Sequence, residues 1–114
     1  MKFGVFFLLH SPNVEDTATV YRRALNQATY ADDLGFDSAW FAEHHFSTYG
    51  YCPNPLMMAV KAAQVTKHVR LGTAVIVLPF WNPLRLAEEI AMADVLTEGR
   101  LDVGVARGYQ KYEF

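Results

Sequence analysis

The sequence predicts an α/β fold built on a parallel sheet. Four strand-like segments recur at a nearly constant interval of 33, 35 and 30 residues when their centres are aligned on Phe3, Phe36, Leu71 and Leu101. That interval accommodates one strand, one helix and two short loops. The first and third segments are apolar on both faces, which is typical of a parallel strand covered on both sides. Short connections with right-handed crossovers would keep all the strands parallel.

The first predicted strand covers residues 2–9 (KFGVFFLL), and residues 10–13 (HSPN) break it. A helix follows over about 15–34, because apolar residues fall on one stripe at helical spacing. Gly35 stands in the usual helix-stop position. The second strand covers 36–41, and a loop with Gly50, Cys52 and Pro53 follows it.

An asparagine–proline pair opens each of the next two helices. Asn54-Pro55 and Asn82-Pro83 both combine an N-cap with proline at the first helical position. The helices extend to about residues 67 and 97, and strands at 70–78 and 100–106 follow them. The order is therefore βαβαβαβ, within one domain that contains no linker. A closed barrel of eight such units needs roughly 250 residues, so the chain is either a small open sheet or part of something larger.

Composition excludes several classes of partner. The chain has 114 residues, 52% hydrophobic and 19% charged, with a net charge of −2 and a pI of about 6.0. No basic run suggests nucleic acid, and no apolar stretch is long enough to span a membrane. The N-terminus lacks the features of a signal peptide. The single cysteine, Cys52, fits a reducing compartment, so we expect a cytoplasmic protein that acts on a small molecule.

The run Glu43-His44-His45 follows the second strand, and active sites gather at the carboxyl ends of parallel strands. A neutral imidazole can take or give a proton near neutral pH, which favours general acid–base chemistry. Two alternatives remain at this point. The histidines can be a hydrogen-bonded pair at a loop edge, or they can bind a metal. The run lacks the i, i+4 spacing of the common zinc motif.

Two further positions are candidates for ligand contacts. Arg107 follows the fourth strand, where a guanidinium is suited to hold a phosphate, although a surface arginine is the simpler interpretation. The small residues of Gly72-Thr73-Ala74-Val75 indicate a bulge, a close backbone approach or a tight helix–sheet contact. Neither the glycine fingerprint of dinucleotide binding nor a P-loop occurs, which disfavours a nicotinamide-binding domain.

Taken together, short motifs along the chain resemble the bacterial luciferase-like monooxygenases, a family of flavin-dependent enzymes. The matching stretches are MKFG (1–4), GFD (35–37), EHHF (43–46), GTAVIVLP (72–79), NP (82–83), GR (99–100) and GVARG (104–108). They span the chain in register. The resemblance implies a TIM barrel, of which residues 1–114 are a single incomplete domain: the N-terminal half, with its first four strands and three helices.

The resemblance also implies an activity. Such an enzyme uses reduced FMN and O2 to oxidise a small organic substrate such as an aldehyde. By the same match, His44 is a general acid/base, His45 shapes the site, and Glu43 is assigned to cofactor binding. The Ala74–Val75 bond matches a non-proline cis peptide beneath the flavin ring, and Arg107 matches a contact to the flavin phosphate. No metal ligands are expected.

Two alternatives and two departures accompany this resemblance. Related members use the deazaflavin F420 as reductases or dehydrogenases, and a beta-type partner subunit without a site of its own is the non-catalytic alternative. Ala106 replaces the reactive cysteine of the luciferase alpha chain, so that thiol is not available and luminescence is left open. The chain covers about the first third of a typical member, so we expect it to be inactive alone.

The resemblance further implies a homo- or heterodimer that packs the second and third helices across its interface. The residues expected there are Ala59, Ala62, Ala63, Glu88 and Glu89. Alternatively, the alanines pack only against the sheet of their own chain.

Overall fold

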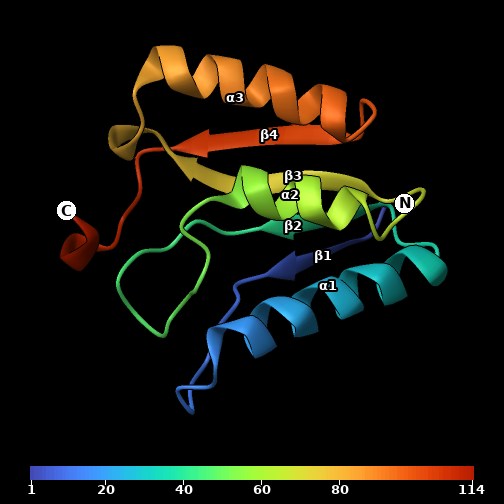
Figure 1. Cartoon of the computed structure of the whole chain (residues 1–114), viewed down its shortest axis with the longest axis horizontal. Coiled ribbons are helices and arrows are strands. Elements are labelled where there is room, and N and C mark those ends of the chain that lie inside the picture. Colours follow the sequence, from blue (N-terminus) through green and yellow to red (C-terminus); the bar gives the residue numbers. More distant parts are fainter.

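The computed structural model describes all residues, 1–114, and confirms the predicted alternation of strands and helices. Four parallel strands form one sheet in the order β1-β2-β3-β4. Figure 1 shows the four arrows pointing the same way, with the helices along one side of the sheet. The elements are β1 (Gly4–Phe7), α1 (Thr17–Asp33), β2 (Ser38–Phe41), α2 (Pro55–Ala63), β3 (Arg70–Val77), η1 (Leu78–Phe80), α3 (Pro83–Leu96), β4 (Leu101–Ala106) and η2 (Lys111–Glu113).

Local chemistry explains where the helices begin. The side chain of Asp16 accepts the Thr19 backbone N–H, so α1 begins two residues later than the sequence suggested. Asn54 caps α2 by accepting from Met57, and Asn82 caps α3 by accepting from Leu84 and Arg85. Both asparagine–proline predictions are thereby confirmed.

The first strand and the second helix differ most in length from the prediction. The first strand has four residues rather than eight, because only Gly4–Phe7 pair in register with β2. The second helix ends at Ala63 instead of about residue 67. The backbone N–H groups of Lys67, His68 and Val69 turn away from it to bind the side chain of Asp32.

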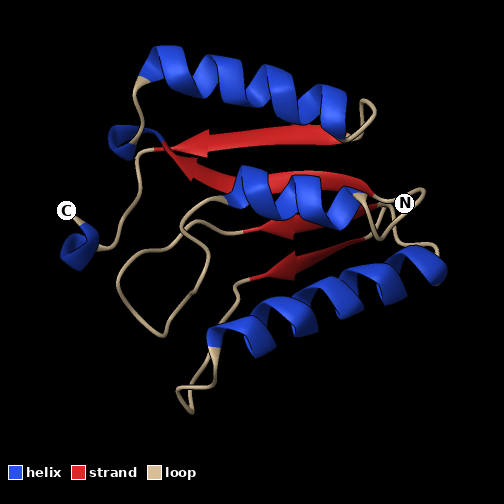
Figure 2. Ribbon diagram, in the orientation of Figure 1, coloured by secondary structure: helices blue, strands red, loops and turns tan.

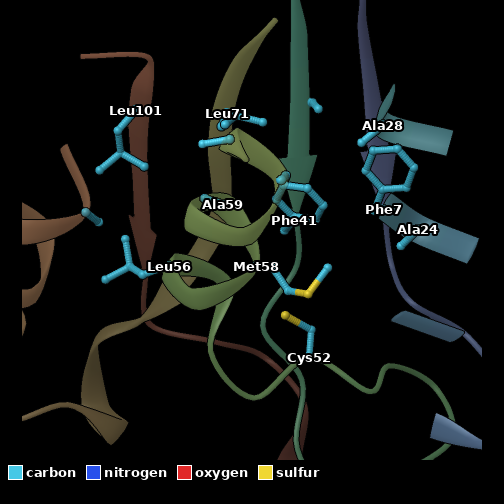
Figure 3. Close-up of a cluster of buried hydrophobic side chains, with 14 of the residues drawn as sticks. Phe7, Ala24, Ala28, Phe41, Cys52, Leu56, Met58, Ala59, Leu71 and Leu101 are labelled. Atoms are coloured by element: carbon cyan, nitrogen blue, oxygen red, sulfur yellow. The ribbon is translucent and has the colours of Figure 1, made fainter. Parts of the chain in front are cut away.

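The core lies between the sheet and the three helices. Each crossover has the same hand and the strands follow in chain order, which places all the helices on one face. Figure 3 shows Phe7, Phe41 and Leu71 of the strands directed towards small residues of α1 and α2. The rings of Phe7 and Phe41 stack with their centroids 5.3 Å apart. The alanine-rich helices let this layer pack closely.

The three alanines expected at a dimer interface belong to this core. Ala59 and Ala62 are fully buried and Ala63 is 7% exposed, all against the chain's own sheet. Their assignment to an interface with another subunit was therefore wrong. Of the two alternatives, packing within the chain is the one that the structure has.

The other face of the sheet is covered by no helix (Figure 2). Phe6 lies on this face and is 58% exposed, while the neighbouring Trp40 is half-buried. The indole of Trp40 lies over Gly72, where an added Cβ would come within 2.1 Å of the ring. No helix is long and apolar enough to cross a membrane.

Candidate active site

The connections that follow β1, β2 and β4 meet at the carboxyl edge of the sheet. Figure 1 shows the long β2–α2 loop and the C-terminal turn at this same edge. Backbone hydrogen bonds join the loops: Ser11 donates to Thr48, Tyr51 donates to Leu9, and His44 donates to Cys52. The edge predicted to carry chemistry is therefore a cluster of loops tied to one another.

His44 is paired with a carboxylate that sequence reasoning missed. Its Nδ1 lies 2.9 Å from Oε1 of Glu113 in η2, and the two side chains are 8% and 1% exposed. The same carboxylate oxygen accepts the backbone N–H of His45 at 3.0 Å. The C-terminal turn thus reaches back across 69 positions to hold this histidine.

His45 is paired with a different carboxylate through a different ring nitrogen. Its Nε2 lies 2.8 Å from Oε1 of Glu43, whose side chain is fully buried. The ring also contacts Phe80 edge to face, with centroids 4.8 Å apart. Neighbouring residues of an extended chain point to opposite sides, so the two imidazoles face different surroundings.

Glu43 links three segments. Beyond His45, it accepts the Val77 backbone N–H at 2.8 Å and the Trp81 indole N–H at 3.1 Å from both oxygens. These donors come from the end of β3 and from the loop before α3. The carboxylate therefore fixes how the β3–α3 connection sits beside the histidines.

Two tyrosines flank the ring of His44. Tyr49 meets it edge-on with centroids 4.8 Å apart, and Tyr109 lies at 6.3 Å. The two tyrosine hydroxyl oxygens are 3.3 Å apart. This hydrogen bond raises the pKa of Tyr49 above its ordinary value. Gly50 packs against the same histidine, since a Cβ there would lie 2.9 Å from the His44 Cβ.

The residues predicted to contact a cofactor lie on β3 and just after β4. The peptide bond between Ala74 and Val75 is cis, as the resemblance implies, and both residues are half-buried. The pairing of β3 with β4 is irregular between Thr73 and Ile76. Arg107 is exposed, and its guanidinium has no hydrogen bond or ion pair within the chain. Its five donors are thus available to a phosphate, which fits the expected flavin.

Cys52 lies under the site but is not a reactive group. Burial raises the pKa of its thiol to about 12, so the thiol stays protonated at neutral pH. No group of three or more histidine, cysteine or acidic side chains is arranged to hold a metal ion.

Sequence reasoning missed Glu113, Tyr49, Tyr109 and Trp81. Glu113 lies in a tail that follows the last strand, and nothing local marks it as a partner of His44. The aromatic residues have the same problem, because core aromatic residues and site aromatic residues look alike in a sequence. The fold and the site together define a class of protein. It is a parallel α/β protein with paired histidine–carboxylate contacts at the carboxyl edge of its sheet.

The family is shown by comparison with known proteins. Residues 1–114 match the family of luciferase-like monooxygenases over the whole chain, and the chain belongs to that family. It is 40% identical to the oxygenase component of a flavin-dependent trigonelline monooxygenase from Acinetobacter baylyi. It is 37% identical to the alkanal monooxygenase alpha chain of the Kryptophanaron alfredi symbiont. Each match covers 100% of this chain and 32% of the relative, so the chain spans about a third of their length.

Solved structures agree with this. The monooxygenase RslO1 from Streptomyces bottropensis matches with a TM-score of 0.93 and 39% identity, over 100% of this chain and 35% of that one. The oxygenating constituent of 3,6-diketocamphane monooxygenase from Pseudomonas putida, in complex with FMN, matches with a TM-score of 0.93 and 26% identity, over 98% and 31%. An F420-dependent tetrahydromethanopterin reductase from Methanopyrus kandleri matches with a TM-score of 0.76 and 25% identity, over 99% and 28%.

Proposed function

We propose that this chain supplies the N-terminal half of the barrel and the proton-handling side of an FMN-dependent monooxygenase. The observation that carries the proposal is His44, held by a buried carboxylate at the carboxyl edge of the sheet in a chain of this family. The enzyme would take reduced FMN and O2 and oxidise a small organic substrate, for which an aldehyde is the first candidate. The alkanal monooxygenase relative supports that choice.

The chain's own residues would hold the cofactor and move protons. Arg107 would bind the flavin phosphate, and Ala74 and Val75 would lie beneath the ring. Reduced flavin would supply the electrons and the reaction with O2, as cofactors do in such enzymes. His44 would exchange a proton at its Nε2, while the surrounding aromatic side chains would exclude water.

Glu43 has a different place in this proposal from the one its motif implies. Its two oxygens already accept from Val77, Trp81 and His45. It would therefore support the cofactor site by fixing the β3–α3 connection. His45 would shape the site together with Phe80, as the resemblance implies.

The direct test is His44→Ala in the full-length gene product. Loss of a general acid/base lowers turnover by roughly 10²–10⁴-fold, and we expect FMN affinity, followed by fluorescence titration, to stay within about twofold because Arg107 is unchanged. The control is His68→Ala, since His68 is exposed and lies beyond the amino end of the sheet. Unchanged turnover of His44→Ala would remove the assigned role.

An F420-dependent reductase or dehydrogenase is the second candidate. The observation in its favour is the structural match to an F420-dependent reductase. Such an enzyme needs no O2, so turnover under strictly anaerobic conditions would favour it over the monooxygenase. A non-catalytic, beta-type partner subunit is the third. It would bind and stabilise a second chain but oxidise nothing itself.

Self-association through α2 and α3 is part of the proposal. Apolar residues of the two helices line a groove of about 420 Å³: Met57, Met92 and Leu96 are exposed there, and Val60 is half-buried. Glu89 also lines this groove, and the adjacent Glu88 is exposed. A homodimer or heterodimer would bury this groove. We also expect this chain alone to be inactive and the whole enzyme to be cytoplasmic.

A further inference from the structure

Two adjacent histidines contact two different carboxylates through opposite ring nitrogens. His44 uses Nδ1 towards Glu113, and His45 uses Nε2 towards Glu43, at 2.9 and 2.8 Å. All four side chains are at least 84% buried. The His45 contact lies within the Glu-His-His run, whereas the His44 contact depends on Glu113 from the far end of the chain.

The other partners of each carboxylate show that it acts as an acceptor. Glu113 also accepts the backbone N–H of His45, and Glu43 also accepts the N–H groups of Val77 and Trp81. These groups can only donate. A carboxylate that accepts from the ring as well requires the proton on the facing nitrogen. That nitrogen is Nδ1 in His44 and Nε2 in His45.

The remaining ring nitrogens are left for other chemistry. Neither Nε2 of His44 nor Nδ1 of His45 has a hydrogen-bond partner in the chain, and no buried side-chain nitrogen or oxygen lacks one. Both free nitrogens therefore reach the surface. A cavity of about 490 Å³ is lined by both histidines and by other residues of the β2–α2 loop.

We propose that Glu113 and Glu43 are positioning residues that hold His44 and His45 in opposite tautomers. His44 then presents an unprotonated Nε2, and His45 presents an unprotonated Nδ1. A proton acceptor at Nε2 of His44 is what the proposed general base needs, so the functional part of this inference rests on the proposed function. The tautomers themselves do not depend on flavin or substrate.

The test is a long-range ¹H–¹⁵N correlation spectrum of the full-length gene product, labelled with ¹⁵N-histidine and free of flavin. At about pH 8 an unperturbed imidazole is neutral, and protonated and unprotonated ring nitrogens then differ clearly in shift. We expect the Nδ1–H pattern for His44 and the Nε2–H pattern for His45. His10 and His68 are exposed internal references without a side-chain partner and should show averaged patterns. His44→Gln and His45→Gln assign the signals.

Variants connect the tautomer to turnover. Glu113→Ala should shift His44 towards the averaged pattern and leave His45 unchanged, and Glu43→Ala should do the reverse. Glu113→Gln should lower turnover by roughly 10- to 10⁴-fold, the range seen when the orienting partner of a catalytic histidine or ligand is lost. Glu113→Asp keeps an acceptor and should recover both the Nδ1–H pattern and part of the turnover.

The outcomes separate the two proposals. An Nε2–H pattern, or protons on both nitrogens, for His44 in the unmodified protein would overturn the tautomer assignment without any variant having to fold. A His44 signal that is unchanged in a folded Glu113→Ala variant would also overturn the tautomer assignment. The predicted tautomers in a protein that oxidises nothing would instead refute the proposed function alone.

Discussion

The two ends of the sheet use the same kinds of residue for different purposes. At the amino end, charged side chains bind backbone groups and one another, and the contacts close the fold. At the carboxyl end, buried carboxylates bind histidines whose second nitrogen stays free. In our proposal the carboxyl end carries the chemistry and the amino end maintains the structure, the division typical of parallel βα units.

Three charged side chains, each with several hydrogen bonds, stabilise the amino end. Asp32 accepts three consecutive backbone N–H groups at 2.6–2.9 Å. Arg100 donates to the carbonyl of Ala63, the last residue of α2, and to the carbonyls of Thr66 and Val69 beyond it. Arg70 forms two hydrogen bonds with Asp102, at 2.8 and 2.7 Å. Every one of these groups is satisfied within the chain.

The carboxyl end has more unusual backbone and more exposed aromatic surface. Three of the four non-glycine residues with positive φ lie there: Leu9, Val14 and Phe46. Such conformations cost about 1 kcal/mol or more and persist only where the surroundings impose them. Phe46 is also 88% exposed. We therefore expect this end to be the less stable one, and changes there to affect activity more than stability.

The largest effect on stability is expected from Asp32→Asn. Removing the charge and one acceptor leaves backbone donors of residues 67–69 unsatisfied, which should lower the free energy of unfolding by about 3 kcal/mol. Urea denaturation of the full-length gene product measures this. Asp33→Asn is the matched control, because Asp33 is exposed and next in sequence. Equal loss in both variants would contradict a special role for Asp32.

The same residue gives a pH test. Burial alone raises the pKa of Asp32, but the backbone N–H groups of Lys67, Val69 and His68 outweigh it and hold the pKa below its usual value. Its stabilisation is therefore full above the unfolded-state pKa of about 3.9 and is lost as the pH falls through the lower folded-state pKa. The difference in free energy of unfolding between the unmodified protein and Asp32→Asn should be constant above about pH 5 and should narrow below about pH 4. A difference that widens in acid would mean that the pKa of Asp32 is raised by folding, which would contradict this prediction.

Two glycine substitutions compare the ends directly. Gly50→Ala at the carboxyl end would place a Cβ 2.8 Å from the Leu8 carbonyl and 2.9 Å from the His44 Cβ, so turnover should fall about tenfold as the ring is displaced. Gly99→Ala at the amino end meets nothing within 4 Å, but its φ of +73° disfavours a side chain. It should cost about 1 kcal/mol of stability and leave turnover unchanged. Unchanged turnover in Gly50→Ala together with lower turnover in Gly99→Ala would contradict this difference between the two ends.

Arg100→Lys should have an effect as small as that of Gly99→Ala. The guanidinium donates to Thr66 Oγ1 at 3.0 Å and to the carbonyls of Ala63, Thr66 and Val69 at 2.9–3.3 Å. One ammonium cannot reproduce this fork, so the free energy of unfolding should fall by about 1 kcal/mol with turnover unchanged. Arg22→Lys on the exposed face of α1 is the control. An altered turnover would mean that the ends are coupled.

The order of elements could be predicted because periodicity, caps and stop signals are local. Asn54-Pro55 and Asn82-Pro83 start their helices through capping contacts within three residues, and Gly35 and Gly99 follow their helices with positive φ. The end of α2 could not be predicted in the same way. It depends on Asp32, which is more than thirty positions away and competes for the backbone of residues 67–69.

The site was predictable in part for the same reason. Glu43, His44, His45 and Arg107 stand directly after strands, and the carboxyl edge brings such residues together in any parallel sheet. Glu113 could not be found, because its place is set by how the turn after β4 folds back. The interface assigned to Ala59, Ala62 and Ala63 was wrong since small residues serve a helix–sheet contact and a helix–helix contact equally well.

Pairing of each strand with the one before it has a consequence for synthesis. A growing chain can add β2, β3 and β4 in turn to the edge of the sheet, because each strand pairs with the strand made just before it. His44 is different, because its partner Glu113 follows it by 69 residues and is made later by the ribosome. The sheet can therefore form early during translation, and the histidine acquires its partner only when Glu113 emerges.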